Sequence, residues 1–211
     1  MSGRGRLIAF EGGEASGKST QARLLAARMG AVLTREPGAT ELGRRIRDLV
    51  LGPGAAEAHP RAEALLMVAD RAQHVHEVVG PALARGEDVV TDRFSASTLA
   101  YQGFGHGLDV ADLAWLSGWA AQGLEPDVVV LLDVPAPVAH ARQRGRRLDR
   151  MEASGDAFHQ RVREGYLALA AAAPDRWVVV DGAGTEEEVA AQVWAAVAAR
   201  GVLQPHPGPP P

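Results

Sequence analysis

The stretch Gly12-Gly13-Glu14-Ala15-Ser16-Gly17-Lys18-Ser19 matches the phosphate-loop pattern G-x4-G-K-[ST]. It follows the apolar run from Leu7 to Phe10 and leads into an amphipathic segment from Lys18 to Met29. A strand, a loop and a helix in this order are the context that the pattern requires. In such a loop, backbone N–H groups and a helix N-terminus face phosphate oxygens. The sequence therefore predicts a nucleotide site, with Lys18 on the outer phosphates and Ser19 on Mg2+.

Lys18 is the only lysine in the chain. Every other strongly basic residue is an arginine. A preference this strong would have replaced a lysine that served only as a positive charge. A compact, mobile ammonium group is needed at this position, because a rigid planar guanidinium would not fit there. The composition thus indicates, independently of the pattern, that Lys18 is functional.

Length and composition bound the possible classes of protein. The 211 residues suit one domain, which we expect over 1–200. The Pro- and Gly-rich end, 201–211, has little to bury, so we expect it to be disordered. The absence of cysteine excludes disulfides and thiolate chemistry, and the net charge of -4 argues against a nucleic-acid partner. Met1–Arg6 lacks signal-peptide features and the apolar run Val128–Leu132 is too short for a membrane, so we expect a cytoplasmic protein with no membrane partner.

Apolar, β-rich runs alternate with longer helical patterns, which is typical of a three-layer α/β/α fold around a parallel sheet. We expect five parallel strands, at Leu7–Phe10, Ala31–Thr34, Asp88–Thr91, Asp127–Leu132 and Trp177–Val180. Helices are expected at about 18–29, 40–51, 60–85, 95–101, 109–121, 136–144, 155–172 and 185–200. Ligands of such sheets bind at the carboxyl ends of the strands, so the residues that follow each strand are the site candidates.

Several of the predicted strands are followed by charged residues that are candidates for the site. Arg35 has no evident structural duty and is well placed to bind a second phosphate. Asp92 would lie beside the phosphate loop and position Mg2+ or a phosphoryl acceptor, while Arg93 neutralises charge; a surface ion pair between the two is the alternative. Asp133 also ends a strand, but the turn after it gives it a structural role by default.

Further arginines lie on predicted helices. Arg71 has apolar neighbours, so it is either a snorkelling surface residue or a buried reader of a base edge. Five arginines crowd nine residues around Gly145: Arg142, Arg144, Arg146, Arg147 and Arg150. They are either a solvated helix face or a mobile lid, at about 142–153, that stabilises charge during phosphoryl transfer. Because no variable position of the phosphate loop is basic, a catalytic arginine must come from elsewhere.

Six blocks of sequence together resemble the bacterial type of thymidylate kinase, a P-loop nucleoside monophosphate kinase. They are Phe10 through Gln21, Thr34–Gly38, Ala69–Arg71, Asp92-Arg93, Ser97–Gly103 and Leu148–Glu152. They occur in the family's order and spacing over nearly all of residues 6–198. The resemblance implies a P-loop kinase fold, transfer of the γ-phosphate of MgATP to dTMP, and a homodimer. Trp115 and Trp119, one helical turn apart, would form part of the dimer interface or pack in the core.

The resemblance also implies roles for residues at matching positions. ATP would be bound by Gly12, Gly13, Glu14, Ala15, Ser16, Gly17, Lys18, Ser19, Thr20 and Arg142, and Mg2+ by Ser19 and Asp92. The dTMP site would contain Glu14, Arg35, Pro37, Arg47, Met67, Arg71, Arg93, Ser97, Thr98, Tyr101 and Gln102. The catalytic residues would be Lys18, Asp92, Arg93 and one arginine of the lid. Arg144 is the first candidate for the lid arginine. Arg146 and Arg147 are alternatives, because the lid is one residue longer than is usual in the family.

Within the dTMP site, the resemblance places Arg35, Arg47 and Arg93 near the phosphate. Glu14 would meet the 3'-hydroxyl, and Tyr101 would lie against the sugar. Arg71 would bind the thymine edge with help from Thr98 and Gln102. Met67 stands where the family usually has a phenylalanine that stacks on thymine, and its polarizable sulfur would take that place.

Two other functions remain open from the sequence. One is a kinase for another nucleoside monophosphate or for a deoxynucleoside, with Glu11 or Asp92 as the base that a hydroxyl acceptor needs. The other is a nucleotide-binding switch protein with a phosphate loop and no acceptor site. The second gives no reason for Arg71, Asp92-Arg93 and the arginine cluster to occur together.

Overall fold

A five-stranded, all-parallel sheet forms the centre of the computed structural model, which describes residues 4–52, 58–145 and 150–202. The strands lie in the order β2-β3-β1-β4-β5. Their bounds are β1 Leu7–Glu11, β2 Val32–Arg35, β3 Val89–Asp92, β4 Val128–Asp133 and β5 Trp177–Asp181. Every expected strand is present and shifted by no more than one residue at either end, so the predicted α/β/α fold is confirmed.

The helices also follow the predicted pattern. They are α1 Lys18–Met29, α2 Glu41–Leu51, α3 Pro60–His74, α4 Gly80–Ala84, α5 Ser95–Thr98, α6 Val110–Ala120, α7 Ala136–Gln143, α8 Asp156–Ala172 and α9 Glu186–Ala199. Two wider, π-helical turns, η1 Val75–Val79 and η2 Leu99–Gly105, extend α3 and α5. In η1 the N–H of Gly80 donates to the carbonyl of Val75, directly before Pro81, which has no N–H to continue an α-helical ladder.

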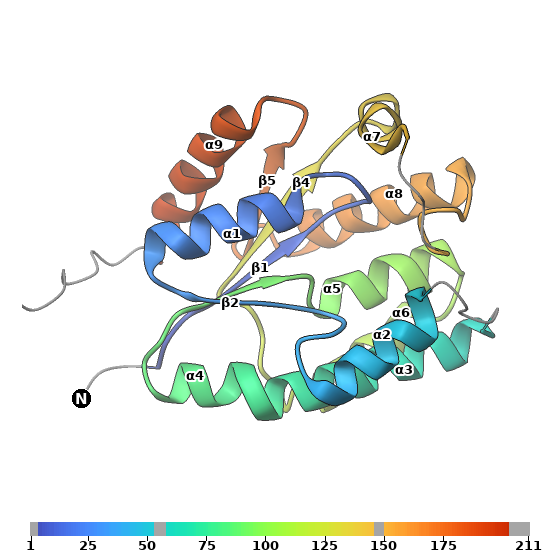
Figure 1. The fold of residues 1–211 in the computed structure, drawn as a ribbon, viewed down its shortest axis with the longest axis horizontal. Coiled ribbons are helices and arrows are strands. Elements are labelled where there is room, and N and C mark those ends of the chain that lie inside the picture. The colour runs from blue at the N-terminus through green and yellow to red at the C-terminus, as the bar shows by residue number, and fades with distance from the viewer. Residues whose placement is uncertain (1–3, 53–57, 146–149, 203–211) are drawn as a thin grey trace, which may run out of the picture.

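The three central strands, β1, β3 and β4, are buried on both faces, which explains their continuous apolar runs. Ile8 and Phe10 of β1 face a core shared with α1 and α9, whereas Leu7 and Ala9 face a core shared with η1 and α4 (Figure 1). Val202 packs in the first of these cores, so the disordered tail expected over 201–211 is wrong at this residue. Its side chain belongs to the same cluster as the buried valines of α9, Val189, Val193 and Val197. Residues 203–211 lie outside the described part of the chain.

Parallel pairing brings the ends of the central strands to one edge of the sheet. Phe10 of β1 is in register with Asp92 of β3, and Arg35 of β2 is in register with the same Asp92. The loop after β1 and the segment after β3 are therefore neighbours at the carboxyl edge of the sheet, where ligands of such folds bind.

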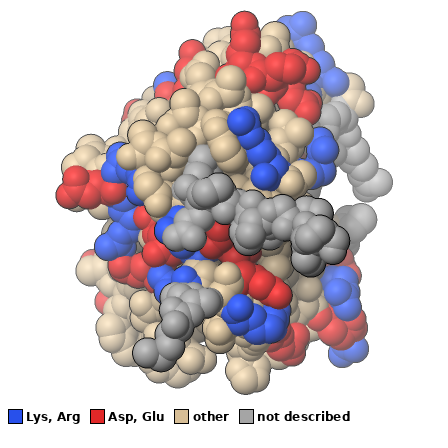
Figure 2. All heavy atoms as spheres, turned by 90° about the vertical axis from the view of Figure 1, so that its left-hand side faces the viewer, with Lys and Arg blue, Asp and Glu red and all other residues tan. Residues whose placement is uncertain are grey.

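The surface offers little large-scale charge segregation on the side that Figure 2 shows, where acidic and basic side chains are interspersed. Within the residues that the structure describes, every helix is too short or too polar to cross a bilayer.

Candidate active site

The loop between β1 and α1 has the backbone that a phosphate-binding turn requires. Gly12 and Gly17 have φ angles of 144° and 93°. A Cβ on Gly12 would lie 2.5 Å from the carbonyl oxygen of Leu132, so only glycine fits there. The side chain of Lys18 folds back along the loop, and its Nζ donates to the carbonyl of Gly13 at 2.6 Å and to Oγ of Ser16 at 3.2 Å. The loop is therefore preformed.

The environment of Lys18 lowers the pKa of its ammonium group. Burial, and then the nearby Arg93, lower the pKa of Lys18 to about 8, although Glu14 and Asp92 act in the opposite direction. Negative charge near the ammonium group, such as that of a nucleotide phosphate, would raise this pKa again. An anionic ligand bound here would therefore stabilise the charged form of Lys18.

Ser19 and Asp92 come together at the start of α1 and the end of β3. The hydroxyl of Ser19 donates to Oδ2 of Asp92, and Oδ1 of Asp92 is buried without a hydrogen-bond partner in the described structure. Hard oxygen ligands of this kind suit Mg2+, which usually keeps few protein ligands beside phosphates and water. The described residues contain no cluster of three or more His, Cys, Asp or Glu that could form a closed metal cage. The chemistry of the pair therefore fits Mg2+.

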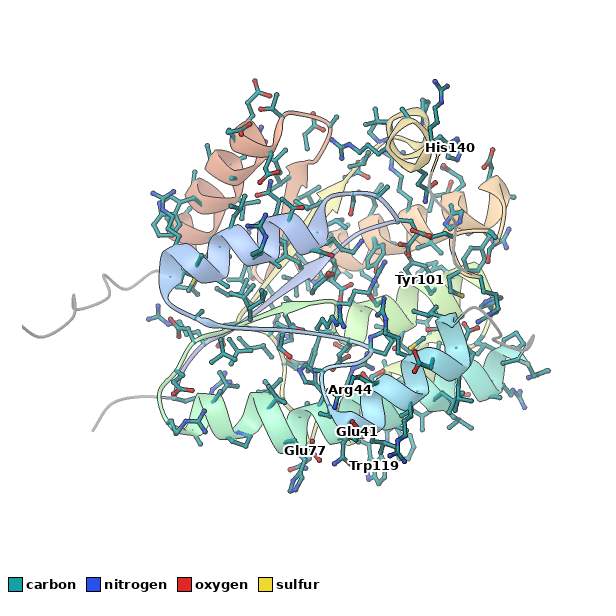
Figure 3. The ribbon with its side chains drawn as sticks, viewed as in Figure 1. Glu41, Arg44, Glu77, Tyr101, Trp119 and His140 are labelled. Carbon is teal, nitrogen blue, oxygen red and sulfur yellow. The ribbon has the colours of Figure 1, made fainter. Side chains whose placement is uncertain are left out.

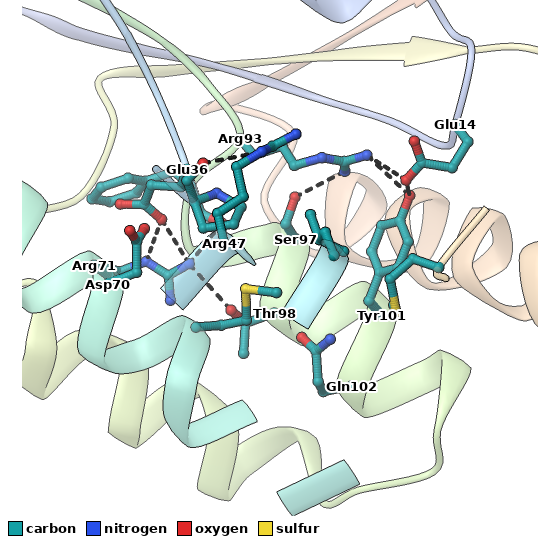
Figure 4. Close-up of a pocket in the computed structure, with 15 residues that line it drawn as sticks. Glu14, Glu36, Arg47, Asp70, Arg71, Arg93, Ser97, Thr98, Tyr101 and Gln102 are labelled. Atoms are coloured by element: carbon teal, nitrogen blue, oxygen red, sulfur yellow. Dashed lines mark hydrogen bonds and ion pairs between the residues drawn. The ribbon is translucent and has the colours of Figure 1, made fainter. Parts of the chain in front are cut away.

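Arg93 follows β3 with a φ of 74°, a strained conformation for a residue other than glycine. This turn directs its guanidinium toward the phosphate loop, where Nη2 lies 2.7 Å from Oε1 of Glu14 and Nη1 lies 3.2 Å from the carbonyl of Gly12 (Figure 4). Burial raises the pKa of Glu14, but Arg93 and Lys18 outweigh it and hold that pKa at about 2. The partner of Arg93 is thus Glu14, which contradicts the alternative of an ion pair with Asp92.

Three hydroxyl groups complete the surroundings of the Arg93 guanidinium. Nη2 donates to the hydroxyl of Tyr101 at 3.1 Å, and Nη1 donates to Oγ of Ser97 and to the hydroxyl of Tyr166, each at 3.2 Å. Tyr101 in turn donates to Oε1 of Glu14 at 2.5 Å. A half-buried, charged guanidinium is therefore held rigidly where the phosphate loop meets the end of β3.

Glu11, the last residue of β1, has no exposed surface. Its Oε1 accepts from the N–H of Phe94 at 2.9 Å, and its Oε2 accepts from the hydroxyls of Ser97 at 2.6 Å and Tyr166 at 3.0 Å. Burial raises the pKa of Glu11, and these donors and Arg93 oppose the rise. Because its oxygens are engaged by structural donors, Glu11 ties β1 to α5 and α8 and is poorly placed to act as a base.

A pocket opens beside Arg93, between the phosphate loop and α2, α3 and α5. It is lined by Glu14, Glu36, Pro37, Arg47, Leu51, Met67, Asp70, Arg71, Arg93, Phe94, Ser97, Thr98, Tyr101, Gln102 and Met151. All of the residues predicted for the dTMP site are in this lining except Arg35. Arg35 is exposed and outside the lining, although its backbone is in register with Asp92. Arg47 lines the pocket and donates from Nη1 to the carbonyl of Pro37 at 3.0 Å.

Arg71 forms the floor of the pocket and is 2% exposed, which excludes the snorkelling interpretation. Its Nε donates to Oε2 of Glu36 at 2.9 Å, and its Nη2 donates to Oγ1 of Thr98 at 3.1 Å (Figure 4). Glu36 also lies 2.9 Å from Nδ1 of His74, so the carboxylate is held from two sides. The guanidinium is therefore fixed in orientation, as a group that reads a flat ligand edge must be.

A second depression lies on the other side of the phosphate loop, and its lining includes Ala15, Ser16, Gly17, Thr20 and Arg142. Nη2 of Arg142 donates to the carbonyl of Gly182 at 2.8 Å, and Nη1 donates to that of Ala15 at 3.3 Å. Half of the residues predicted to bind the donor nucleotide thus line one depression.

Of the predicted lid arginines, Arg144 is exposed directly after α7, and Arg146 and Arg147 lie outside the described residues.

Asp133 forms a two-bond ion pair with Arg163, at 2.6 and 2.8 Å, in keeping with its expected structural role.

Sequence reasoning missed several members of the site, among them Tyr166 and Glu36, which hold Arg93 and Arg71 in place. Tyr166 touches both Arg93 and Glu11 from α8, but it lies inside an ordinary helical pattern that carries no signal of this contact. Glu36 anchors Arg71, and its place at a strand end beside Arg35 and before Pro37 offered a signal that was not used.

The chain is similar to known proteins over most of its length. A family model described as thymidylate kinase matches residues 10–193. A thymidylate kinase of Cutibacterium acnes is 50% identical over 190 residues, which cover 88% of this chain and 92% of the relative. One of Deinococcus radiodurans is 47% identical over 204 residues, covering 94% and 98%. The crystal structure of thymidylate kinase from Ehrlichia chaffeensis matches with a TM-score of 0.78 and 29% identity, covering 92% of this chain and 99% of that one. The chain belongs to the thymidylate kinase family.

Proposed function

We propose that this protein transfers the γ-phosphate of ATP to dTMP, giving dTDP and ADP, with Mg2+ as the metal ion. The observation that carries this proposal is the position of Glu14. It is part of the phosphate loop, and it is also bound to Arg93 and Tyr101 in the wall of the pocket. A donor nucleotide on the loop and an acceptor in the pocket would therefore meet at one place.

The proposed phosphoryl transfer does not need a strong general base. The second pKa of a phosphate monoester is about 6, so the acceptor oxygen is already ionised at neutral pH. The protein must instead place donor and acceptor in line and neutralise charge that spreads over the transferred group. Lys18 and Arg93 supply fixed positive charge on either side of the transfer path. Mg2+ held by Ser19 and Asp92 would supply a further charge on the phosphate oxygens.

The pocket supports the proposed placement of dTMP. Arg93 and Arg47 would face its phosphate, with the more exposed Arg35 beside them. Oε1 of Glu14 is taken by Arg93 and Tyr101, which leaves Oε2 for the 3'-hydroxyl. Arg71, Thr98 and Gln102 would bind the edge of thymine.

The remaining roles concern the ring face and the lid. Met67 lines the pocket, so we propose that its side chain packs on thymine. We further propose that a lid arginine, Arg144, Arg146 or Arg147, stabilises the transferred group. Arg142 would stay with ATP.

The function is tested by comparing dTMP, dUMP, dCMP, dGMP, UMP and thymidine as acceptors with MgATP. We expect the highest kcat/KM for dTMP, because the pocket combines a fixed guanidinium for a base edge with a second arginine for a phosphate. Faster turnover of thymidine, or equal turnover of all monophosphates, would replace the proposal by one of the other kinase functions. Slow ATP hydrolysis that no acceptor accelerates would point to a switch protein.

We also propose that the protein is a homodimer. Trp115 and Trp119 on α6 are each 69% exposed, which excludes core packing as their role. Leu65 on α3 and Leu42 and Leu49 on α2 are exposed as well, and α3 packs against both α2 and α6. Figure 3 shows Trp119 directed away from the sheet. An apolar band across neighbouring helices is typical of a protein interface.

Sedimentation at micromolar concentration tests the dimer. We expect the unaltered protein to sediment as a dimer and the double variant Trp115→Asp, Trp119→Asp as a folded monomer, because buried carboxylates would oppose association. Val179→Asp is the matched control, since Val179 is 53% exposed but lies on β5. A monomeric unaltered protein would contradict the proposal.

A further inference from the structure

Glu63, near the start of α3, has no exposed surface and has no part in the mechanism proposed above. Its Oε1 accepts a hydrogen bond from Nε2 of Gln102 at 2.8 Å, and its Oε2 is paired with Nη2 of Arg150. His106 lies further away, with Nε2 at 3.6 Å from Oε1. A buried carboxylate is costly unless charged and hydrogen-bonding partners compensate it. The question is what this arrangement does for the pocket.

The contact with Glu63 fixes which way the Gln102 amide points. An amide has a donating NH2 end and an accepting carbonyl end, whereas an ionised carboxylate can only accept. The NH2 group of Gln102 must therefore face Glu63. Gln102 is 2% exposed and lines the pocket, into which its amide projects in Figure 4. With its nitrogen committed to Glu63, Gln102 presents its carbonyl oxygen to a ligand.

Arg150 holds the other oxygen of Glu63. Its guanidinium pairs with Oε2, and its Nε is anchored separately on the carbonyl of Val50 at 3.1 Å. With Oε2 occupied by Arg150, the Glu63 side chain is fixed with Oε1 toward Gln102. The Gln102 amide therefore has one preferred orientation.

Arg71 provides the complementary group. A guanidinium has five N–H bonds, and four are used here, by Glu36, Ser117, Phe94 and Thr98. One N–H on Nη1 is left to donate. The pocket therefore offers a donor from Arg71 and an acceptor from Gln102.

This pair of groups distinguishes the two kinds of pyrimidine. Thymine and uracil carry an accepting oxygen at position 4 and a donating N–H at position 3. Cytosine carries a donating amine at position 4 and an accepting nitrogen at position 3, so both contacts would be reversed. A site whose buried polar groups are left unpaired rejects the wrong ligand strongly.

We propose that Glu63 is a positioning residue that sets the preference for thymine-type over cytosine-type acceptors, by holding the Gln102 amide with its carbonyl toward the base. The proposal rests on the function proposed above, since it concerns the base of the same acceptor. It assigns a specificity role to a side chain that itself touches no substrate.

The variant Glu63→Gln tests this role. Its new amide can donate to the Gln102 carbonyl, which allows Gln102 to rotate and present NH2 to the pocket. We expect the ratio of kcat/KM for dTMP to that for dCMP to fall by about tenfold or more. The kcat/KM for dCMP should rise in absolute terms, which a purely structural defect would not produce.

Two controls accompany the test. Glu77→Gln makes the same change at an exposed glutamate that also accepts from a glutamine, Gln73, and should leave both substrates unaffected. Glu63→Asp retains a side chain that only accepts and should keep the dTMP preference, even with lower activity. Circular dichroism and thermal unfolding establish that each variant is folded.

The outcomes separate this proposal from the proposed function. An unaltered protein with no preference for dTMP would overturn the function. A preference for dTMP that persists unchanged in folded Glu63→Gln, or an equal loss for both acceptors, would overturn the positioning role alone. If Glu63→Gln does not fold, Glu63→Ala decides, because it removes the acceptor: a lowered ratio supports the role, and an unchanged ratio in folded protein overturns it.

Discussion

Lys18→Met is expected to lower kcat/KM for phosphoryl transfer by about 10³-fold or more, because it removes fixed positive charge from the transferred phosphoryl group. Within the described residues, the ammonium group hydrogen-bonds to its own loop, at Gly13 and Ser16, so no hydrogen bond between distant elements is lost. We therefore expect the far-ultraviolet circular dichroism and the thermal midpoint to stay close to those of the unaltered protein. Steady-state kinetics with MgATP and dTMP measure the loss.

Lys18→Arg is the matched variant, since it keeps the charge but replaces the compact ammonium by a planar fork. We expect it to be severely impaired too, because Lys18 is only 6% exposed within a tight loop. Substantial activity in Lys18→Arg would mean that charge alone suffices at this position. A folded Lys18→Met protein with undiminished turnover would contradict the proposed role of the loop.

Arg93→Ala is expected to cause a similar loss, again about 10³-fold or more in kcat/KM. Its guanidinium is held beside Glu14 at the point where the loop and the pocket meet, and alanine offers nothing to an acceptor phosphate. Unlike Lys18→Met, this change removes the ion-pair partner of the half-buried Glu14 carboxylate, at a cost of about 2 kcal/mol in the free energy of unfolding. The variant should therefore be assayed below its lowered Tm.

Arg163→Ala is a suitable control for Arg93→Ala. Arg163 also pairs with a strand-end carboxylate, Asp133, but outside the acceptor pocket. We expect it to retain most of the activity. Well-folded Arg93→Ala protein with an unchanged kcat/KM would exclude Arg93 from the reaction.

Local patterns explain why the fold and the loop could be predicted from the sequence. The phosphate loop is a contiguous stretch with its own backbone requirements at Gly12 and Gly17. The buried strands are short apolar runs, and the residues at their ends converge wherever the strands are parallel. The sequence alone therefore predicts that Asp92 and Arg93 lie beside the phosphate loop.

Other features depend on tertiary packing that no local pattern contains. Nothing in the sequence around Glu63 or Tyr166 shows which groups they meet, since their partners are distant in the chain. Arg71 left two interpretations open, because an arginine among apolar residues is compatible with either burial or snorkelling. The tryptophans of α6 were equally ambiguous until the orientation of that helix was known.

The contacts of Arg93 bear on how the protein folds. Its guanidinium reaches Gly12, Glu14 and Tyr166, which are 81, 79 and 73 positions away in the chain. Such long-range contacts form late in folding, because the conformational entropy of the large loops that they close must be lost first. The guanidinium has all of these partners only once α8 has docked with Tyr166 in place. Recovery of catalysis during refolding should therefore report the last stage of folding rather than the formation of the sheet.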